Sequence, residues 1–147
     1  MCIRDRSKSN QRLLDSHSFI SRANDASDAL SKSGLALAHF GTITLECVLS
    51  GRPVIAAGMV HPLTYILVKP FVKTPFFALP NLLLGQAAFP ELVQDDCQPA
   101  RFVEAYRGLT ECFEDALNEC AKIRLVASEI PDLATRSLFD ALQIGYE

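Results

Sequence analysis

A glycine, two threonines and a glutamate in the stretch GTITLE have the types and spacing that suit nucleotide binding: Gly41, Thr42, Thr44 and Glu46. Gly41 lets the backbone approach a ligand closely, and the free N–H groups of a helix that begins at Thr42 favour an anion such as phosphate. Glu46 lies four residues after Thr42, one turn deeper on the same helix face, where its carboxylate can accept hydrogen bonds from ribose hydroxyls. A capped helix with an acidic residue near its start is the alternative interpretation.

The apolar runs on both sides of this turn predict a βαβ unit. The run LALAHF, residues 35–40, suits a strand covered on both faces, and PVIAA, residues 53–57, suits a second buried strand. A helix over 42–49 connects them and is expected to end near Gly51, which can adopt the left-handed conformation that terminates helices. This order of elements favours a parallel sheet in an α/β domain.

Weaker signals predict the remaining elements. Residues 24–33 form a polar helix with Asn24 or Asp25 as its cap, and Pro99 fits the first position of another helix. The other expected elements are a weak strand at 19–21, a helix at 62–68, a strand at 76–79, helical periodicity after Asn81 with an apolar series over 109–123, and a last helix from Asp132.

Three further polar residues could face a ligand: Asn81, Glu91 and Gln94. Asn81 follows the predicted strand at 76–79, so its amide would lie at a carboxyl end of the sheet and could hydrogen-bond a sugar or a base. Glu91 and Gln94 are three residues apart and could share one helix face.

The apolar stretch 59–84 contains only two fully charged side chains, Lys69 and Lys73. Its four prolines and two lysines exclude an ordinary transmembrane span, which needs about 20 mainly apolar residues. The stretch is therefore either buried core or an apolar surface, edged by lysines, that rests on anionic lipid.

Composition limits the remaining classes of function. The chain of 147 residues is 49% hydrophobic with a net charge of -3, which fits one domain and argues against an extended nucleic-acid interface. The five cysteines include no C-x-x-C pair, and the three isolated histidines indicate no metal site. The charged N-terminus is not a signal peptide. We expect residues 1–16 to be a non-core segment and residues 17–147 to form the domain.

Four segments occur in the order and with the spacing of an enzyme family. They are GTITLE, GRPVIAAG, HPLTYILVKPFVKTPFFALPNLL and PELVQDD. Together, between residues 28 and 107, they resemble the C-terminal part of the lipid-A-disaccharide synthase family, whose members are inverting GT-B glycosyltransferases. The resemblance implies a partial GT-B donor-binding domain, with a Rossmann-like parallel sheet of the α/β class followed by C-terminal helices.

The resemblance also implies a hexosyltransferase of lipid A biosynthesis that needs no cofactor. Its donor would be UDP-2,3-diacylglucosamine and its acceptor 2,3-diacylglucosamine 1-phosphate. Position by position, the residues implied to line the UDP diphosphate are Gly41, Thr42 and Thr44. Those implied to surround the nucleotide and sugar are Glu46, Asn81, Glu91 and Gln94. Those implied to face the membrane that holds both acylated substrates are Leu63, Tyr65, Lys69 and Lys73.

The family's catalytic base is expected in a preceding N-terminal domain, so no residue here is assigned that role and the chain alone is expected to be inactive. The resemblance further implies a cytoplasmic protein, peripheral to the inner membrane and compatible with a homodimer. The chain departs from the family at Phe40, where a serine is usual, and at Gly58 and Met59, where a Tyr-Arg pair is usual.

Two other functions stay open on the residues alone. One is a GT-B enzyme that uses UDP-N-acetylglucosamine, which the P-L-T-Y and L-P-N segments disfavour. The other is a non-catalytic α/β module that associates with membranes and has no nucleotide chemistry, in which Glu46 only stabilises a helix. A test of UDP binding distinguishes these functions, because both transferases should bind UDP and the membrane module should not.

Overall fold

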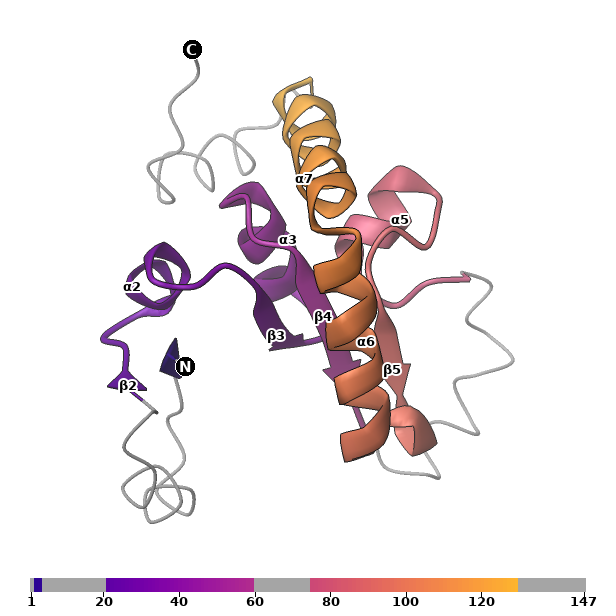
Figure 1. The fold of residues 1–147 in the computed structure, drawn as a ribbon. Coiled ribbons are helices and arrows are strands. Elements are labelled where there is room, and N and C mark those ends of the chain that lie inside the picture. The colour runs from indigo at the N-terminus through magenta and orange to yellow at the C-terminus, as the bar shows by residue number, and fades with distance from the viewer. Residues whose placement is uncertain (1, 4–20, 60–74, 130–147) are drawn as a thin grey trace.

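Short apolar strands and connecting helices form a parallel sheet with helices on both faces (Figure 1). The computed structural model describes residues 2–3, 21–59 and 75–129. In chain order the elements are β1 (Cys2–Ile3), β2 (Ser21–Arg22), α2 (Ala26–Ser31), β3 (Ala36–His39), α3 (Thr42–Leu49), β4 (Val54–Gly58), α5 (Leu79–Leu84), β5 (Glu91–Val93), the 3-10 helix η2 (Gln94–Asp96), α6 (Pro99–Glu111) and α7 (Phe113–Ser128).

The main sheet has the order β3-β4-β5, and both strand pairs are parallel. The register aligns His39 with Ala57, and Gly58 with Val93. The carboxyl ends of all three strands therefore lie at one edge, which places the turn at Gly41 and residue Gln94 on the same side of the sheet. β1 and β2 form a separate parallel pair.

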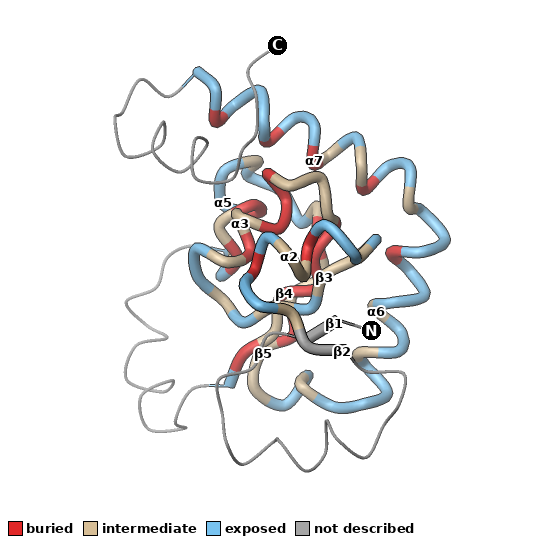
Figure 2. The backbone as a smooth tube through the Cα atoms, turned by 90° about the vertical axis from the view of Figure 1, so that its left-hand side faces the viewer, coloured by how far each residue is buried: buried red, intermediate tan, exposed pale blue. Residues whose placement is uncertain are grey.

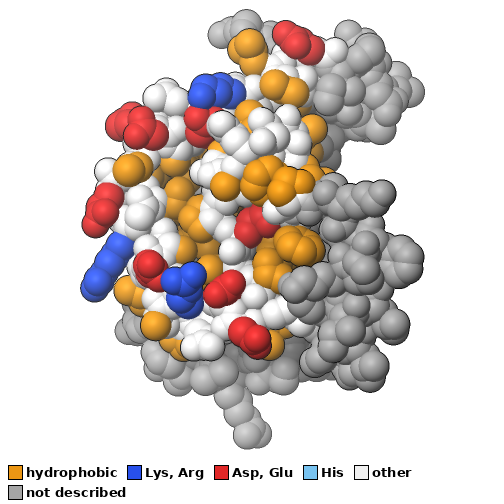
Figure 3. Space-filling model, turned by 90° about the vertical axis from the view of Figure 1, so that its right-hand side faces the viewer, with side chains coloured by type: hydrophobic (Ala, Val, Ile, Leu, Met, Phe, Trp, Pro, Cys, Tyr) orange, Lys and Arg blue, Asp and Glu red, His pale blue; other side chains and the backbone are white. Residues whose placement is uncertain are grey.

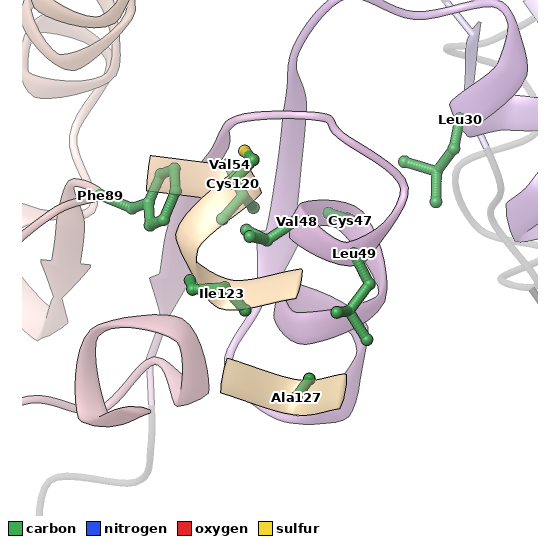
Figure 4. Close-up of a cluster of buried hydrophobic side chains, with 9 residues drawn as sticks. All are labelled: Leu30, Cys47, Val48, Leu49, Val54, Phe89, Cys120, Ile123 and Ala127. Carbon is green, nitrogen blue, oxygen red and sulfur yellow. The ribbon is translucent and has the colours of Figure 1, made fainter. Parts of the chain in front are cut away.

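Alternate residues of the strands pack against different helices. Val54 belongs to a cluster with residues of α3 and α7, among them Val48 and Ile123 (Figure 4). Its neighbour Ile55 packs instead with Leu109 of α6. Because successive strand residues point to opposite faces, α3 and α7 cover one face of the sheet and α6 covers the other. Figure 2 shows the inner side of α7 buried and its outer side exposed.

The helix α3 is fixed at its end by a glycine and an arginine. Gly51 adopts φ 70, the left-handed conformation predicted for the end of this helix. Arg124 of α7 donates from Nε to the carbonyl oxygen of Leu49 at 2.6 Å. A cation beside the last carbonyls of a helix is favoured by the helix dipole, so α7 stabilises α3 through both apolar contact and charge.

The structure confirms the βαβ unit and two helix starts. The predicted helix over 42–49 is α3, the second buried strand is β4, and the two strands are parallel. α2 is capped by Asp25, whose carboxylate accepts from the N–H of Asp28 at 2.7 Å. Pro99 is the first residue of α6.

The expectation that residues 35–40 are covered on both faces was wrong. β3 is an outer strand of the described sheet, and its burial alternates along the strand. Leu37 is 62% exposed because the inward residues of α6 pack mainly over β4 and β5, against Ile55 and Leu92.

The predicted strand at 76–79 and the shared helix face of Glu91 and Gln94 were also wrong. Leu79 begins α5, with Pro80 in its first turn, where the missing N–H of proline costs nothing. Glu91 begins β5, whereas Gln94 begins η2. Asn81 consequently follows no strand and lies inside α5. The expected helices at 62–68 and from Asp132, and most of the expected strand at 19–21, lie outside the described residues.

Replacement of Gly51 by alanine should destabilise the chain by about 1–2 kcal/mol, because a side chain disfavours positive φ. The new Cβ would also lie 3.1 Å from Nη2 of Arg124. Urea unfolding followed by circular dichroism measures the loss. The matched control is Gly108→Ala within α6, where a Cβ meets nothing within 4 Å and should stabilise the helix by about 0.5–1 kcal/mol. Equal effects of both substitutions would contradict the role of Gly51.

Two buried thiols should make stability fall in alkali. Burial raises the pKa of Cys47 from 9.0 to about 12 and that of Cys120 to about 11. Below pH 9 both thiols are neutral in the folded and the unfolded chain, whereas above it the unfolded chain releases protons first, so stability is lost as the pH rises toward these raised values. We expect the free energy of unfolding to drop by about 2–3 kcal/mol more between pH 8 and pH 10 in the wild type than in a Cys47→Ala/Cys120→Ala variant. An identical drop in the wild type and the variant, measured by urea titration, would contradict the role of the two thiols.

Candidate nucleotide site

The amino end of α3 presents free backbone donors beyond the carboxyl edge of the sheet. Gly41 is the capping residue and adopts φ 128, a conformation that side chains disfavour, and no side chain caps the helix. The N–H groups of Thr42 and Ile43 belong to the first turn and have no carbonyl partner within the helix. Together with the positive end of the helix dipole, these donors favour an anion.

The two threonines of the turn have different environments. Thr42 is exposed. Thr44 is completely buried, and its hydroxyl donates to the carbonyl oxygen of Gly41 at 2.7 Å. The backbone N–H of Thr44 donates to the same oxygen at 3.2 Å. Thr44 therefore stabilises the turn from within, while Thr42 offers its hydroxyl and N–H at the surface.

Glu46 lies one turn after Thr42 on the outward stripe of α3. The inward stripe of the helix consists of Thr44, Cys47, Val48 and Leu49, whereas Glu46 is half-buried. Its carboxylate makes no hydrogen bond or ion pair with any other described residue. Among the described residues, the Glu46 carboxylate thus has no partner and lies one turn behind the N–H groups at the start of α3.

Asn81 and Glu91 form a buried network of their own. The Asn81 side chain is fully buried, and Nδ2 donates to the carbonyl oxygen of Phe89 and to Oε1 of Glu91, both at 2.8 Å. Its Oδ1 accepts from the N–H of Phe89 at 2.9 Å. Glu91 also accepts from the N–H groups of Phe77 at 2.8 Å and Ala78 at 3.0 Å. The network ties the start of α5 to β5 and uses both donor hydrogens of Asn81.

Gln94 follows β5 directly, at the carboxyl edge of the sheet. It adopts φ 54, which is unusual for a residue with a side chain, and its carbonyl oxygen accepts from the N–H of Cys97 at 3.0 Å. The sequence-predicted residues thus divide into two groups. Gly41, Thr42, Thr44 and Glu46 lie along the first two turns of α3 and Gln94 lies at the same edge of the sheet, whereas Asn81 and Glu91 join each other in a structural network.

Three aromatic residues near the turn were missed by the pattern of polar residues. Phe40 precedes Gly41, and its ring contacts those of His39 and Phe77. The sequence signal for Phe40 was only its departure from the usual serine. Phe77 and His39 carried no spacing signal, because their contacts with Phe40 depend on strand register and on the loop before α5.

A separate hollow lies between the helices α6 and α7 and residues 75–91. It has a volume of about 560 Å³, and its lining includes Phe76, Asn81, Phe89, Glu91, Leu109 and Asp115. Figure 3 shows hydrophobic side chains gathered on this face of the molecule, with acidic and basic side chains around them. The turn at Gly41 is not among the residues that line this hollow.

Within residues 21–59 and 75–129, no three histidine, cysteine or acidic side chains are grouped closely enough to hold a metal ion. None of the helices in that part of the chain is long and apolar enough to cross a membrane. The residues predicted to face the membrane lie outside the described residues: Leu63, Tyr65, Lys69 and Lys73.

A parallel sheet covered by helices on both faces, with a glycine turn beyond its carboxyl edge, defines a Rossmann-like unit of the kind found in one half of a GT-B glycosyltransferase. The model of the Lipid-A-disaccharide synthetase family matches residues 4–135, and the chain belongs to this family.

Curated relatives named lipid-A-disaccharide synthase match parts of the chain. The protein of Azotobacter vinelandii is 41% identical over 120 residues, which cover 75% of this chain and 31% of the relative. That of Erwinia tasmaniensis is 43% identical over 82 residues, covering 56% of the chain and 22% of the relative. That of Alteromonas mediterranea is 39% identical over 98 residues, covering 58% and 26%. The chain thus spans less than a third of the length of these relatives.

Removal of the Asn81 amide should be far more costly than removal of an exposed amide. Asn81→Ala leaves the buried N–H of Phe89 unpaired and should lower the free energy of unfolding by about 2–4 kcal/mol. Gln86→Ala is the control, since the Gln86 side chain is exposed and its amide donates to Glu119 at 3.0 Å, so its loss should cost less than about 0.5 kcal/mol. Similar urea midpoints for the two variants would show that the network is not structural.

Proposed function

We propose that this chain is the donor-binding part of a transferase that moves 2,3-diacylglucosamine from UDP-2,3-diacylglucosamine to 2,3-diacylglucosamine 1-phosphate. The observation that carries the proposal is the Glu46 carboxylate, which has no partner among the described residues and lies one turn behind the uncapped start of α3. Membership of the Lipid-A-disaccharide synthetase family supports the choice of donor and acceptor over other UDP-sugars.

In this proposal the diphosphate lies at the amino end of α3. The N–H groups of Thr42 and Ile43 donate to phosphate oxygens, the Thr42 hydroxyl adds a donor, and Gly41 has no side chain to obstruct the approach. Glu46 accepts hydrogen bonds from the ribose hydroxyls, since it lies far enough along the helix to avoid the phosphate charge. Thr44, Asn81 and Glu91 hold the turn and the start of α5 in position.

The reaction is a direct displacement. It depends on a good leaving group and forms no covalent intermediate with the chain. An acceptor hydroxyl oxygen bonds to the anomeric carbon as the bond from that carbon to the UDP oxygen breaks, and UDP leaves with the electron pair. Donors at the start of α3 stabilise the negative charge that grows on the diphosphate. The hydroxyl proton passes to a base that we place outside this chain, so the chain alone is expected to form no disaccharide.

The acylated substrates favour a location at the cytoplasmic side of the inner membrane. We propose that the segment containing Leu63, Tyr65, Lys69 and Lys73 contacts this surface, with the lysines near anionic headgroups and the apolar residues between them. A homodimer is compatible with this arrangement, since a second copy would bring a second such segment to the same surface.

UDP should bind the chain and depend on Glu46. Titration followed by amide chemical shifts should move the signals of residues 41–46, and Glu46→Gln should weaken binding about tenfold by losing charged hydrogen bonds to ribose. The wild type should prefer UDP to 2′-deoxy-UDP, whereas Glu46→Gln should not distinguish them. Glu111→Gln on α6 is the charge-matched control and should behave as wild type. No shifts at millimolar UDP in the folded chain would eliminate the donor site and favour a membrane module.

A further inference from the structure

The ring of Phe40 occupies the space above Gly58. The register that aligns His39 with Ala57 brings the next residues, Phe40 and Gly58, opposite each other at the ends of β3 and β4. A Cβ atom on Gly58 would lie 2.5 Å from Cδ2 of Phe40 and 3.0 Å from its Cε2. Such distances are too short for a real contact, so the ring holds this position only because residue 58 has no side chain.

Phe40 is also the centre of an aromatic group. Its ring centroid lies 5.7 Å from that of Phe77, with an interplanar angle of 47°, and 6.1 Å from that of His39, at 72°. These separations lie in the range of favourable ring contacts. We refer to His39, Phe40 and Phe77 as the aromatic wall.

The aromatic wall is held from several sides and is still accessible. The backbone N–H of Phe77 is fixed by the Glu91 carboxylate, and the Phe40 ring rests on the backbone of Gly58. Phe77 is nevertheless 41% exposed, and His39 is exposed. A positioned aromatic surface that remains open to solvent at the carboxyl edge of a sheet is suited to contact an apolar part of a ligand.

The wall adjoins the turn that we assign to the diphosphate, because Gly41 directly follows Phe40. A sugar nucleotide extends from its diphosphate in two directions, toward the nucleoside and toward the sugar. We assign Glu46 to the ribose of the nucleoside. The aromatic wall is therefore left to contact the sugar on the other side of the diphosphate. Building on the proposed function, we propose that the aromatic wall contacts the acylated glucosamine of the donor and selects a sugar that carries acyl chains.

The ligand of the wall can be tested by comparing UDP with UDP-2,3-diacylglucosamine. Phe77→Ala should leave the affinity for UDP unchanged and weaken the acylated donor about tenfold, since an apolar contact of one aromatic side chain is lost. Leu125→Ala is the control, because Leu125 is an exposed residue of α7 and should affect neither ligand.

Each outcome of this titration is decisive. Equal weakening of both ligands would place the wall against the nucleoside and overturn the inference, as would no weakening of the acylated donor. Failure of the wild-type chain to bind UDP would overturn the proposed function itself. Unchanged affinity of Phe77→Ala for the acylated donor, in a chain that still binds UDP, would overturn the role of the wall alone.

The pairing of Phe40 with Gly58 has a separate test that needs no ligand. Gly58→Ala should lower the equilibrium constant for folding at least about tenfold in the wild type, because the new methyl group displaces the ring. In a Phe40→Ala background the same substitution should have less than about a twofold effect. Equal losses in both backgrounds would show that the ring does not depend on the glycine.

Discussion

Parallel pairing of β3 with β4 is the constraint on which the rest of the structure depends. Two parallel neighbours require a crossover, and α3 supplies it within the residues between His39 and Val54. This geometry places the amino end of α3 beyond the carboxyl edge of the sheet, beside Gly58 and close to the end of β5. The position of the turn at Gly41 and the contact of Phe40 with Gly58 both follow from this strand register.

The sequence predicted the elements whose signals are local. α3 is bounded by Gly41 and Gly51 and flanked by two apolar runs, so its limits and the parallel βαβ class followed directly. β5 was missed because it has only three residues, too few to show a period. The two phenylalanines before α5 favoured a strand by propensity, but Pro80 and the Glu91 carboxylate stabilise a helix start there.

The part of the candidate site that lies on one helix could be predicted from the sequence, because its signal is also local. Thr42 and Glu46 are four residues apart, and helix geometry alone relates them. Asn81 and Glu91 are separated by ten residues and a change of element, so their mutual hydrogen bond could not be inferred from spacing. Phe40 and Gly58 likewise meet only because of strand register, and residue types give no sign of which ring lies over which glycine.

The hydrogen bond from Arg124 to Leu49 joins residues that are 75 positions apart. The cluster it adjoins extends from Leu30 to Ala127. During synthesis on the ribosome, the sheet and α3 therefore emerge well before the helix that covers them. Contacts of such long range slow folding, and the uncovered apolar face of α3 is exposed to other chains in the interval. The carboxyl end of α3 therefore gains the hydrogen bond to Leu49 only after α7 has been synthesised.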